Sequence, residues 1–142
     1  MAKNSREVYT FTWTQDGTGY LDIADDIEPS ACTVNDPKGL RATTADLAID
    51  VASASKIYLQ CDTTDVASSS NFDFKILSSA DGVTYETTGE EYFIASLAQA
   101  INKVTSSATT PAPQYIKVRL DVNAVNVDAA KDVVLKVFIN KR

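Results

Sequence analysis

The apolar and polar positions of this chain alternate over most of its length. The clearest segment is Asn71 to Thr88, where polar residues separate three large apolar ones on one strand face: Phe72, Phe74 and Ile76. Asp81-Gly82 follows, and glycine takes positive φ values without a Cβ clash. The pattern predicts an antiparallel hairpin in which Val83 to Tyr85 returns along the first strand.

Other segments show the same period of two, and each predicts a strand. They are Glu7 to Trp13, Tyr20 to Ile23, Asp46 to Val51, Lys56 to Cys61 and Tyr115 to Val122. In the first of them Tyr9, Phe11 and Trp13 share one face, so we expect these rings to be mostly covered. Val133 to Ile139 is almost continuously apolar, as in a strand covered on both faces or held in a subunit contact.

Short connections between these segments suggest which strands pair. Glu7 to Trp13 would pair with Tyr20 to Ile23, and this first strand would lie at a sheet edge. Asp46 to Val51 would form a hairpin with Lys56 to Cys61 across a small-residue turn. The short connection after Val122 would allow the last two strands to pair with each other.

Two segments depart from the alternation. Ala24 to Thr43 has no sustained period and contains two prolines and a glycine, which predicts a long irregular loop. Between Ile94 and Val104 the apolar residues have the spacing of one helical face: Ile94, Leu97, Ala98 and Ile101. A short helix is predicted there, with a twisted strand as the alternative.

About eight strands separated by turns predict an all-β protein, an antiparallel β-sandwich of jelly-roll or immunoglobulin-like topology with one short helix. The 142 residues suit a single domain spanning positions 1–142. Residues 1–6 are polar and are expected to form a flexible N-terminal arm without the apolar stretch of a secretion signal.

Composition narrows the choice of partner. Nineteen acidic and 13 basic residues give a formal charge of −6, which disfavours direct contact with nucleic acid or with an anionic membrane surface. No apolar run reaches the roughly 18 residues that a membrane helix needs. We therefore expect neither a nucleic-acid partner nor a membrane partner.

Candidate chemistry is sparse. The chain has no histidine, which removes the usual base of a nucleophilic triad and the commonest metal ligand, so no catalytic residue, metal site or cofactor is predicted. Two acidic groupings are weighed: Asp25 with Asp62 as a carboxylate pair, and Asp22, Asp25, Asp26 and Glu28 as Ca²⁺ ligands. The latter lack the spacing of a calcium loop, which favours a solvated acidic loop.

Cys32 and Cys61 are the only cysteines in the sequence. A count of two does not establish a disulfide, and Cys61 continues an apolar strand face. A buried free thiol is therefore the favoured interpretation, with a bridge as the alternative.

The segment Ser79 to Tyr85 resembles the Ser-x-Asp-Gly-x-Thr-Trp turn of Asp-box hairpins, which also occurs in discoidin-like carbohydrate-binding sandwiches. Tyr85 stands where that pattern has tryptophan, and only one copy is present. The resemblance implies a stable hairpin.

The order of elements resembles that of small structural proteins of tailed-phage virions. Tyr115 to Leu120 and Val133 to Ile139 carry this resemblance. It implies a non-enzymatic virion protein, a capsid decoration, cement or accessory subunit, which binds the major capsid or other virion proteins as a homo-oligomer. The alternative is a carbohydrate-binding β-sandwich module, which would need exposed aromatic rings on one face.

Overall fold

The computed structural model describes residues 5–14, 20–21, 24–62, 70–87, 90–97, 102–107, 114–122, 127–128 and 133–141. Every regular element within these ranges is a strand. The strands are β1 (Ser5–Trp13), β2 (Tyr20–Leu21), β3 (Ala24–Ile27), β4 (Ala31–Asp36), β5 (Gly39–Thr43), β6 (Ile49–Asp50), β7 (Ala54–Asp62), β8 (Ser70–Ser79), β9 (Glu90–Leu97), β10 (Asn102–Ser107), β11 (Tyr115–Val122), β12 (Val127–Asp128) and β13 (Val133–Lys141).

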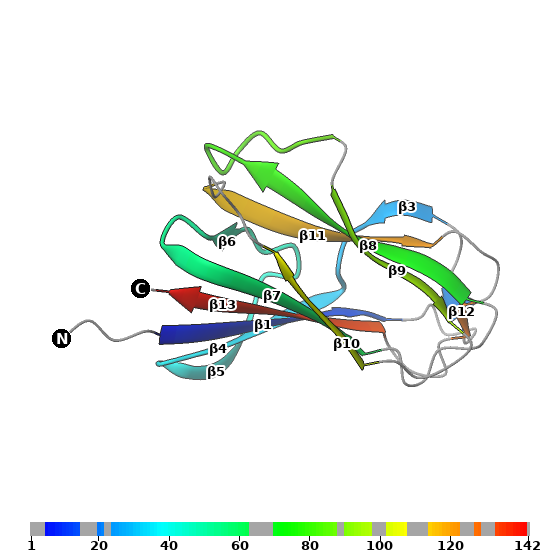
Figure 1. Ribbon diagram of the computed structural model, residues 1–142, viewed down its shortest axis with the longest axis horizontal. Helices are drawn as coiled ribbons and strands as arrows, with labels where there is room; N and C mark the ends of the chain where they lie inside the picture. The colour runs from blue at the N-terminus through cyan, green and yellow to red at the C-terminus, as the bar shows by residue number, and fades with distance from the viewer. Residues whose placement is uncertain are drawn as a thin grey trace.

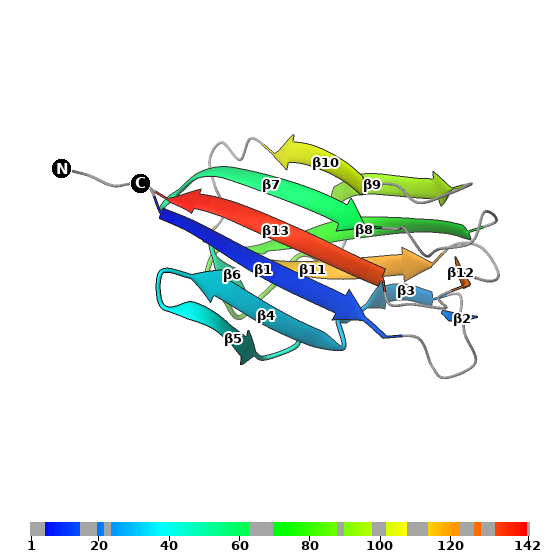
Figure 2. The same ribbon diagram turned by 90° about the horizontal axis from the view of Figure 1, so that it is seen from below.

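The strands form two stacked antiparallel sheets (Figure 1). The six-stranded sheet has the order β10-β7-β13-β1-β4-β5, and Figure 2 shows it from its outer side. The five-stranded sheet has the order β3-β11-β8-β9, with β6 also paired to β11. β2 and β12 form a separate two-stranded ribbon. The predicted antiparallel β-sandwich is confirmed.

The core lies between the sheets and is built by the inward face of each strand, because side chains alternate along a strand. Trp13 of β1 and Phe74 of β8 meet across it with ring centroids 5.5 Å apart. Burial of one such side chain contributes about 1.5–3 kcal/mol. The largest fully buried side chains come from both sheets: Trp13, Phe11, Phe74, Ile49, Leu59, Leu120, Leu135, Ile139, Val51 and Val118.

β13 lies in the middle of the six-stranded sheet, between β1 and β7. Two predictions are therefore wrong, because β1 is not an edge strand and β13 does not pair with β11. The prediction that β13 is covered on both faces holds for one face only. Its inward residues are fully buried, whereas Val134 and Phe138 on the other face are half-buried and Lys136 is exposed.

Two residues of the N-terminal arm predicted for residues 1–6, Ser5 and Arg6, belong instead to β1. Ser5 pairs with Lys141 and Arg6 with Asn140, so β1 begins before the expected strand. The start of β1 and the end of β13 consequently lie at the same end of the sandwich (Figure 1). Residues 1–4 lie outside the described part of the chain.

β8 confirms the inward face predicted from its alternation, since Phe74 and Ile76 are buried. The side chain of Phe72 lies outside the description. Gly82 has the expected positive φ, 79°. The predicted return strand at Val83 to Tyr85 is wrong, because this segment consists of bends and β8 pairs instead with β9 and β11. The Asp-Gly turn opens a wider loop rather than a tight hairpin.

The other two predicted hairpins are also wrong. β1 pairs with β4 and β13, while β2 pairs with β12. β6 pairs with β11 of the five-stranded sheet, whereas β7 pairs with β13 and β10 of the six-stranded sheet. The short segment between β6 and β7 thus passes from one layer to the other, and a short connection permits a hairpin without requiring one.

The predicted irregular loop from Ala24 to Thr43 contains three strands, β3, β4 and β5. Cys32 and Val34 point into the core from β4, so alternation is present there over a short length. The two prolines lie between strands: Pro29 precedes β4, and Pro37 lies in the turn that also contains Gly39, with φ 104°. Prolines between strands interrupt the sequence pattern without interrupting the sheets.

The predicted helix from Ile94 to Val104 is wrong. Residues 90–97 form β9, which pairs with β8, and residues 102–107 form β10, which pairs with β7. Residues 98–101 lie outside the description. Pairing with a neighbouring strand has outweighed a weak helical period, as is common where local preference is small. No helix long and apolar enough to cross a membrane occurs in the described ranges.

Candidate functional site

The outer face of the six-stranded sheet has a row of positions across five strands, four of which carry an apolar residue. Because the odd-numbered residues of β1 point into the core, its even-numbered residues point outward. Phe138 pairs with Val8 on one side and with Tyr58 on the other. Beyond Val8 the same row passes Asn35 and reaches Leu40 on the edge strand β5. We call Tyr58, Phe138, Val8 and Leu40 the apolar row.

The apolar row is partly open to solvent. Tyr58, Phe138 and Val8 are half-buried, and Leu40 is 72% exposed at the edge of the sheet. Single exposed apolar residues are normal on protein surfaces. A row that continues over neighbouring strands is less common and is typical of interaction surfaces.

Cationic side chains border this row. The Arg6 guanidinium lies 5.8 Å from the centre of the Phe138 ring, and its Nε donates a hydrogen bond to Asn140 Oδ1 at 3.2 Å. Arg6 therefore makes a cation–π contact with Phe138, and the hydrogen bond to Asn140 holds the guanidinium in place. Lys136 is exposed one row further along β13, and Lys38 is exposed in the turn between β4 and β5. None of the outward-facing side chains described for this sheet is acidic.

Among the described side chains, the acidic residues near this face, Glu7 and Asp36, point toward the core side and are paired. Lys141 Nζ lies 3.1 Å from Glu7 Oε1, which also accepts a hydrogen bond from the Tyr9 hydroxyl. Burial, reinforced by Glu7, raises the pKa of Tyr9 above its usual range. Arg41 donates two hydrogen bonds to Asp36 and lowers the pKa of that carboxyl to about 2.

The outer face of the five-stranded sheet has a different character, a network of paired charges. Arg119 is buried and contacts both carboxylate oxygens of Asp46, which also accepts a hydrogen bond from Lys117 at 3.1 Å. Burial opposes ionisation of Asp46, but the hydrogen bonds from Arg119 and Lys117 outweigh it and lower its pKa. The Lys117 ammonium also lies 4.7 Å from the centre of the Tyr85 ring.

A second pair lies beside this network. Lys75 Nζ is 2.6 Å from Asp121 Oδ2, and the other carboxylate oxygen accepts a hydrogen bond from the backbone N–H of Asp26 at 2.7 Å. Asp121 is 4% exposed, so these contacts compensate the cost of burying its charge. Asp46 and Asp121 thus hold β3, β8, β11 and the segment before β6 together.

The Asp-box-like loop is stabilised by its own side chains. Asp81 Oδ1 accepts hydrogen bonds from the backbone N–H groups of Val83 and Thr84, both at 2.8 Å, and from the Ser79 hydroxyl at 3.0 Å. The two backbone bonds are the main reason why the pKa of Asp81 is lowered. The Asp81 carboxylate thus orders the loop, although the tight hairpin with Val83 to Tyr85 as its return strand does not form.

The predicted acidic grouping is only partly described. Asp25, Asp26 and Glu28 are exposed, Glu28 faces Arg119 at 3.8 Å, and Asp22 lies outside the description. No set of three or more potential ligands in the described residues is arranged to hold a metal ion. The side chain of Asp62 also lies outside the description, so its pairing with Asp25 stays a hypothesis.

The remaining sequence candidates lie inside the protein. Tyr9, Phe11 and Trp13 are buried, as predicted, and offer no exposed aromatic platform. Cys32 is a free buried thiol, so it is not bridged to Cys61, and burial raises its pKa to about 12.

The sequence pattern alone did not identify Tyr58 and Phe138 as parts of an interaction surface. Both residues alternate with core residues along their strands and so face outward, but their proximity depends on the pairing of β7 with β13.

No family model matches this chain, and the search of curated proteins found no match.

Proposed function

We infer that this chain is a non-enzymatic structural subunit of a virus particle, a capsid decoration, cement or accessory protein that binds the coat lattice. The observation that carries this proposal is the apolar row on the outer face of the six-stranded sheet. An outward sheet face that is only solvated alternates with polar residues. Here Tyr58, Phe138 and Val8 are neighbours across three strands, and Leu40 lies beyond Asn35 at the edge of the sheet.

A structural role agrees with the use made of the charged groups. Asp46 and Asp121 are engaged in ion pairs, and Asp81 accepts hydrogen bonds that order its own loop. A catalytic acid or base needs a reachable proton and a suitable pKa. The lowered pKa values of Asp46 and Asp81 reflect hydrogen bonds that stabilise the fold.

The proposed partners are the major capsid protein or other virion proteins, together with further copies of this chain. Contacts with the coat would be made by the loops and by the N-terminal segment 1–6, whose Arg6 lies at the start of β1. A lattice repeats each contact many times, so weak individual contacts give strong total binding through avidity. Binding would locate the chain in the virion.

Imaging of particles tests this proposal. Virus particles released by the cells that express the chain are labelled with an antibody raised against it and examined by electron microscopy. The proposal expects label at repeated positions on the particle, and loss of the label from particles made without the gene. Particles that contain no copy of the chain would overturn the assignment.

A second candidate is a carbohydrate-binding module, favoured by the neighbouring rings of Tyr58 and Phe138 on the outer face. Aromatic rings in such a position stack against sugar faces. A glycan array with the unaltered chain and with Phe138→Ala separates the two functions. Binding that is lost in the variant supports the module, and an absence of binding to any glycan removes it.

A further inference from the structure

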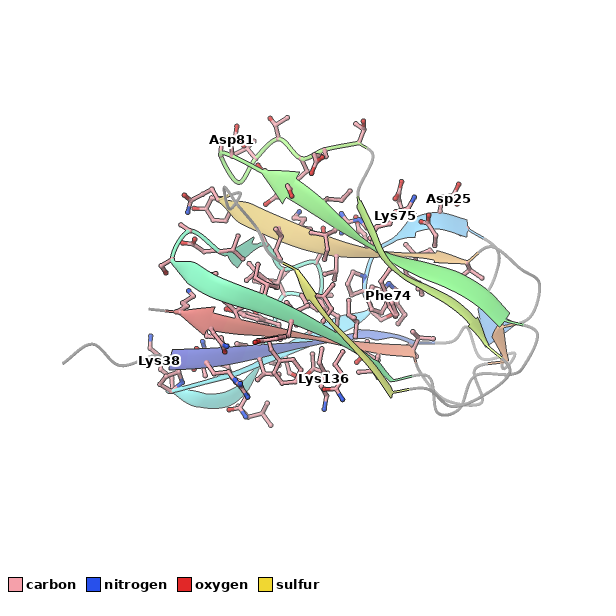
Figure 3. The ribbon with its side chains drawn as sticks, viewed as in Figure 1. Asp25, Lys38, Phe74, Lys75, Asp81 and Lys136 are labelled. Carbon is pink, nitrogen blue, oxygen red and sulfur yellow. The ribbon has the colours of Figure 1, made fainter. Side chains whose placement is uncertain are left out.

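The described charges are distributed unevenly between the two sides of the sandwich. Lys38 and Lys136 lie on the side of the six-stranded sheet, whereas Asp25 and Asp81 lie on the side of the five-stranded sheet (Figure 3). The basic side includes the apolar row and Arg6. Although the chain has a formal charge of −6, one of its faces is therefore suited to an acidic surface.

The acidic side offers such a surface at β3 and just after it. Asp25 and Asp26 are exposed, and the side chain of Glu28 is 65% exposed. We call these three residues the acidic segment. They are more exposed than Asp46 and Asp121, which are held in ion pairs, although Glu28 also lies 3.8 Å from the Arg119 guanidinium. Because the Glu28 side chain stays 65% exposed, the acidic segment can meet an external cation while Asp46 and Asp121 keep their own partners.

We propose that the outer face of the six-stranded sheet binds the acidic segment of a second copy of this chain, so that copies associate head to tail. The apolar row would be covered, and Arg6 and Lys136 would face Asp25, Asp26 and Glu28 of the next copy. Opposite charges in contact favour this orientation, and the covered row supplies the apolar burial. The inference rests on the proposed function in one respect, that the chain is an assembly subunit.

A symmetric contact through the same face is disfavoured. In a two-fold dimer of this kind a patch meets its own copy, so the cations Arg6 and Lys136 would approach the cations of the partner. Like charges placed opposite one another cost free energy. A head-to-tail contact avoids this repulsion, since it joins two different surfaces of the same chain.

Each copy carries both surfaces, so association does not stop at two unless the geometry closes. A head-to-tail contact forms a ring when its rotation divides a full turn and an open filament when it does not. Either product presents the chain as a repeated unit. This agrees with a subunit that follows a lattice.

The test uses the purified full chain and analytical ultracentrifugation over a range of concentrations and salt. The unaltered chain is expected to self-associate, and salt is expected to weaken the association by screening the charges. Lys136→Glu and Asp25→Lys should each raise the dissociation constant more than about tenfold, because each places like charges in the contact. Circular dichroism and thermal melting confirm that each variant is folded.

The double variant Lys136→Glu with Asp25→Lys is the decisive control. It has the formal charge of the unaltered chain, and in a head-to-tail contact it restores opposite charges between copies. Recovery of association in this variant supports the proposal and excludes an effect of net charge. A chain that stays monomeric, or one whose association is unaffected by Asp25→Lys, overturns it. Particle labelling is measured separately, so its failure is distinguishable from failure of self-association.

Discussion

The rings of Trp13 and Phe74 lie 5.5 Å apart between centroids, with their planes tilted by 52°. One belongs to β1 of the six-stranded sheet and the other to β8 of the five-stranded sheet, so the pair joins the two layers. The Trp13 Nε1–H donates a hydrogen bond to the Ile27 carbonyl oxygen at 2.9 Å. The indole therefore satisfies its polar atom while its ring fills the core, and it attaches β3 as well.

Phe74→Ala removes one half of this contact. Phe74 is completely buried, and a cavity left in a core costs about 3–5 kcal/mol for this substitution. The free energy of unfolding, measured by urea denaturation, should fall by that amount. Phe138→Ala is the matched control, since the same residue type is half-buried on the outer face and should cost less. Equal losses for the two variants would contradict the assignment of the core.

Among the described residues, Gly39 and Gly82 have positive φ, and a comparison of the two separates the cost of backbone strain from that of steric contact. A Cβ added at Gly82, where φ is 79°, would lie 3.0 Å from Tyr115 Cε2, whereas one added at Gly39, where φ is 104°, would meet nothing within 4 Å. Gly39→Ala should cost about 1–2 kcal/mol through strain alone. Gly82→Ala should cost more and Gly82→Val most, as measured by thermal unfolding. An unchanged melting temperature in Gly82→Val would show that the loop does not require positive φ.

Asp46 makes stability depend on pH. Its pKa is lowered on folding from an ordinary value of 3.8, so its ionised form contributes stability above that pH, and the contribution is lost as pH falls through the lowered pKa. Asp46→Asn should cost roughly 1.5–3 kcal/mol near neutral pH, the range for hydrogen bonds to charged groups. Denaturation at a series of pH values should show the difference from the unaltered chain shrinking in acid. A difference that is constant throughout would rule out this linkage.

Cys32 should be unreactive in the folded protein. Its thiol is buried and its pKa is raised to about 12, so little thiolate forms at pH 8. Alkylation with iodoacetamide followed by peptide mass spectrometry should find Cys32 unmodified in buffer and modified in denaturant. The peptide map distinguishes it from Cys61. Rapid labelling of Cys32 in buffer would mean that β4 is less well packed than described.

The sequence predicted which side chains face the core better than it predicted which strands pair. Alternation correctly placed Phe74 and Ile76, and the rings of β1, in the core. Alternation is a local property, because successive side chains point to opposite sides of any strand. Pairing is not local: β13 lies beside β1, with Ser5 opposite Lys141, and no short connection indicates this. The three predicted hairpins followed chain proximity: in two of them the strands pair elsewhere, and in the third the return segment Val83 to Tyr85 is not a strand.

The candidate interaction surface could not be predicted from the sequence either, because it also depends on which strands pair. Tyr58, Phe138 and Val8 become neighbours only through the registers of β7, β13 and β1. Each residue taken alone is an ordinary outward position. The helix predicted near Ile94 from the apolar spacing was wrong for a different reason. This segment forms β9 because β8 provides a strand with which it pairs.

The central position of β13 affects how the protein is made. During translation β1 and β7 emerge long before the nine residues of β13, which must be placed between them. Until residues 133–141 leave the ribosome, both earlier strands keep an open edge that can pair with another nascent chain. Closure of the sheet is therefore a late event with long-range contacts, in the class of β-proteins that fold in milliseconds to seconds. Ribosomes translating the same message in close succession would expose these edges to one another.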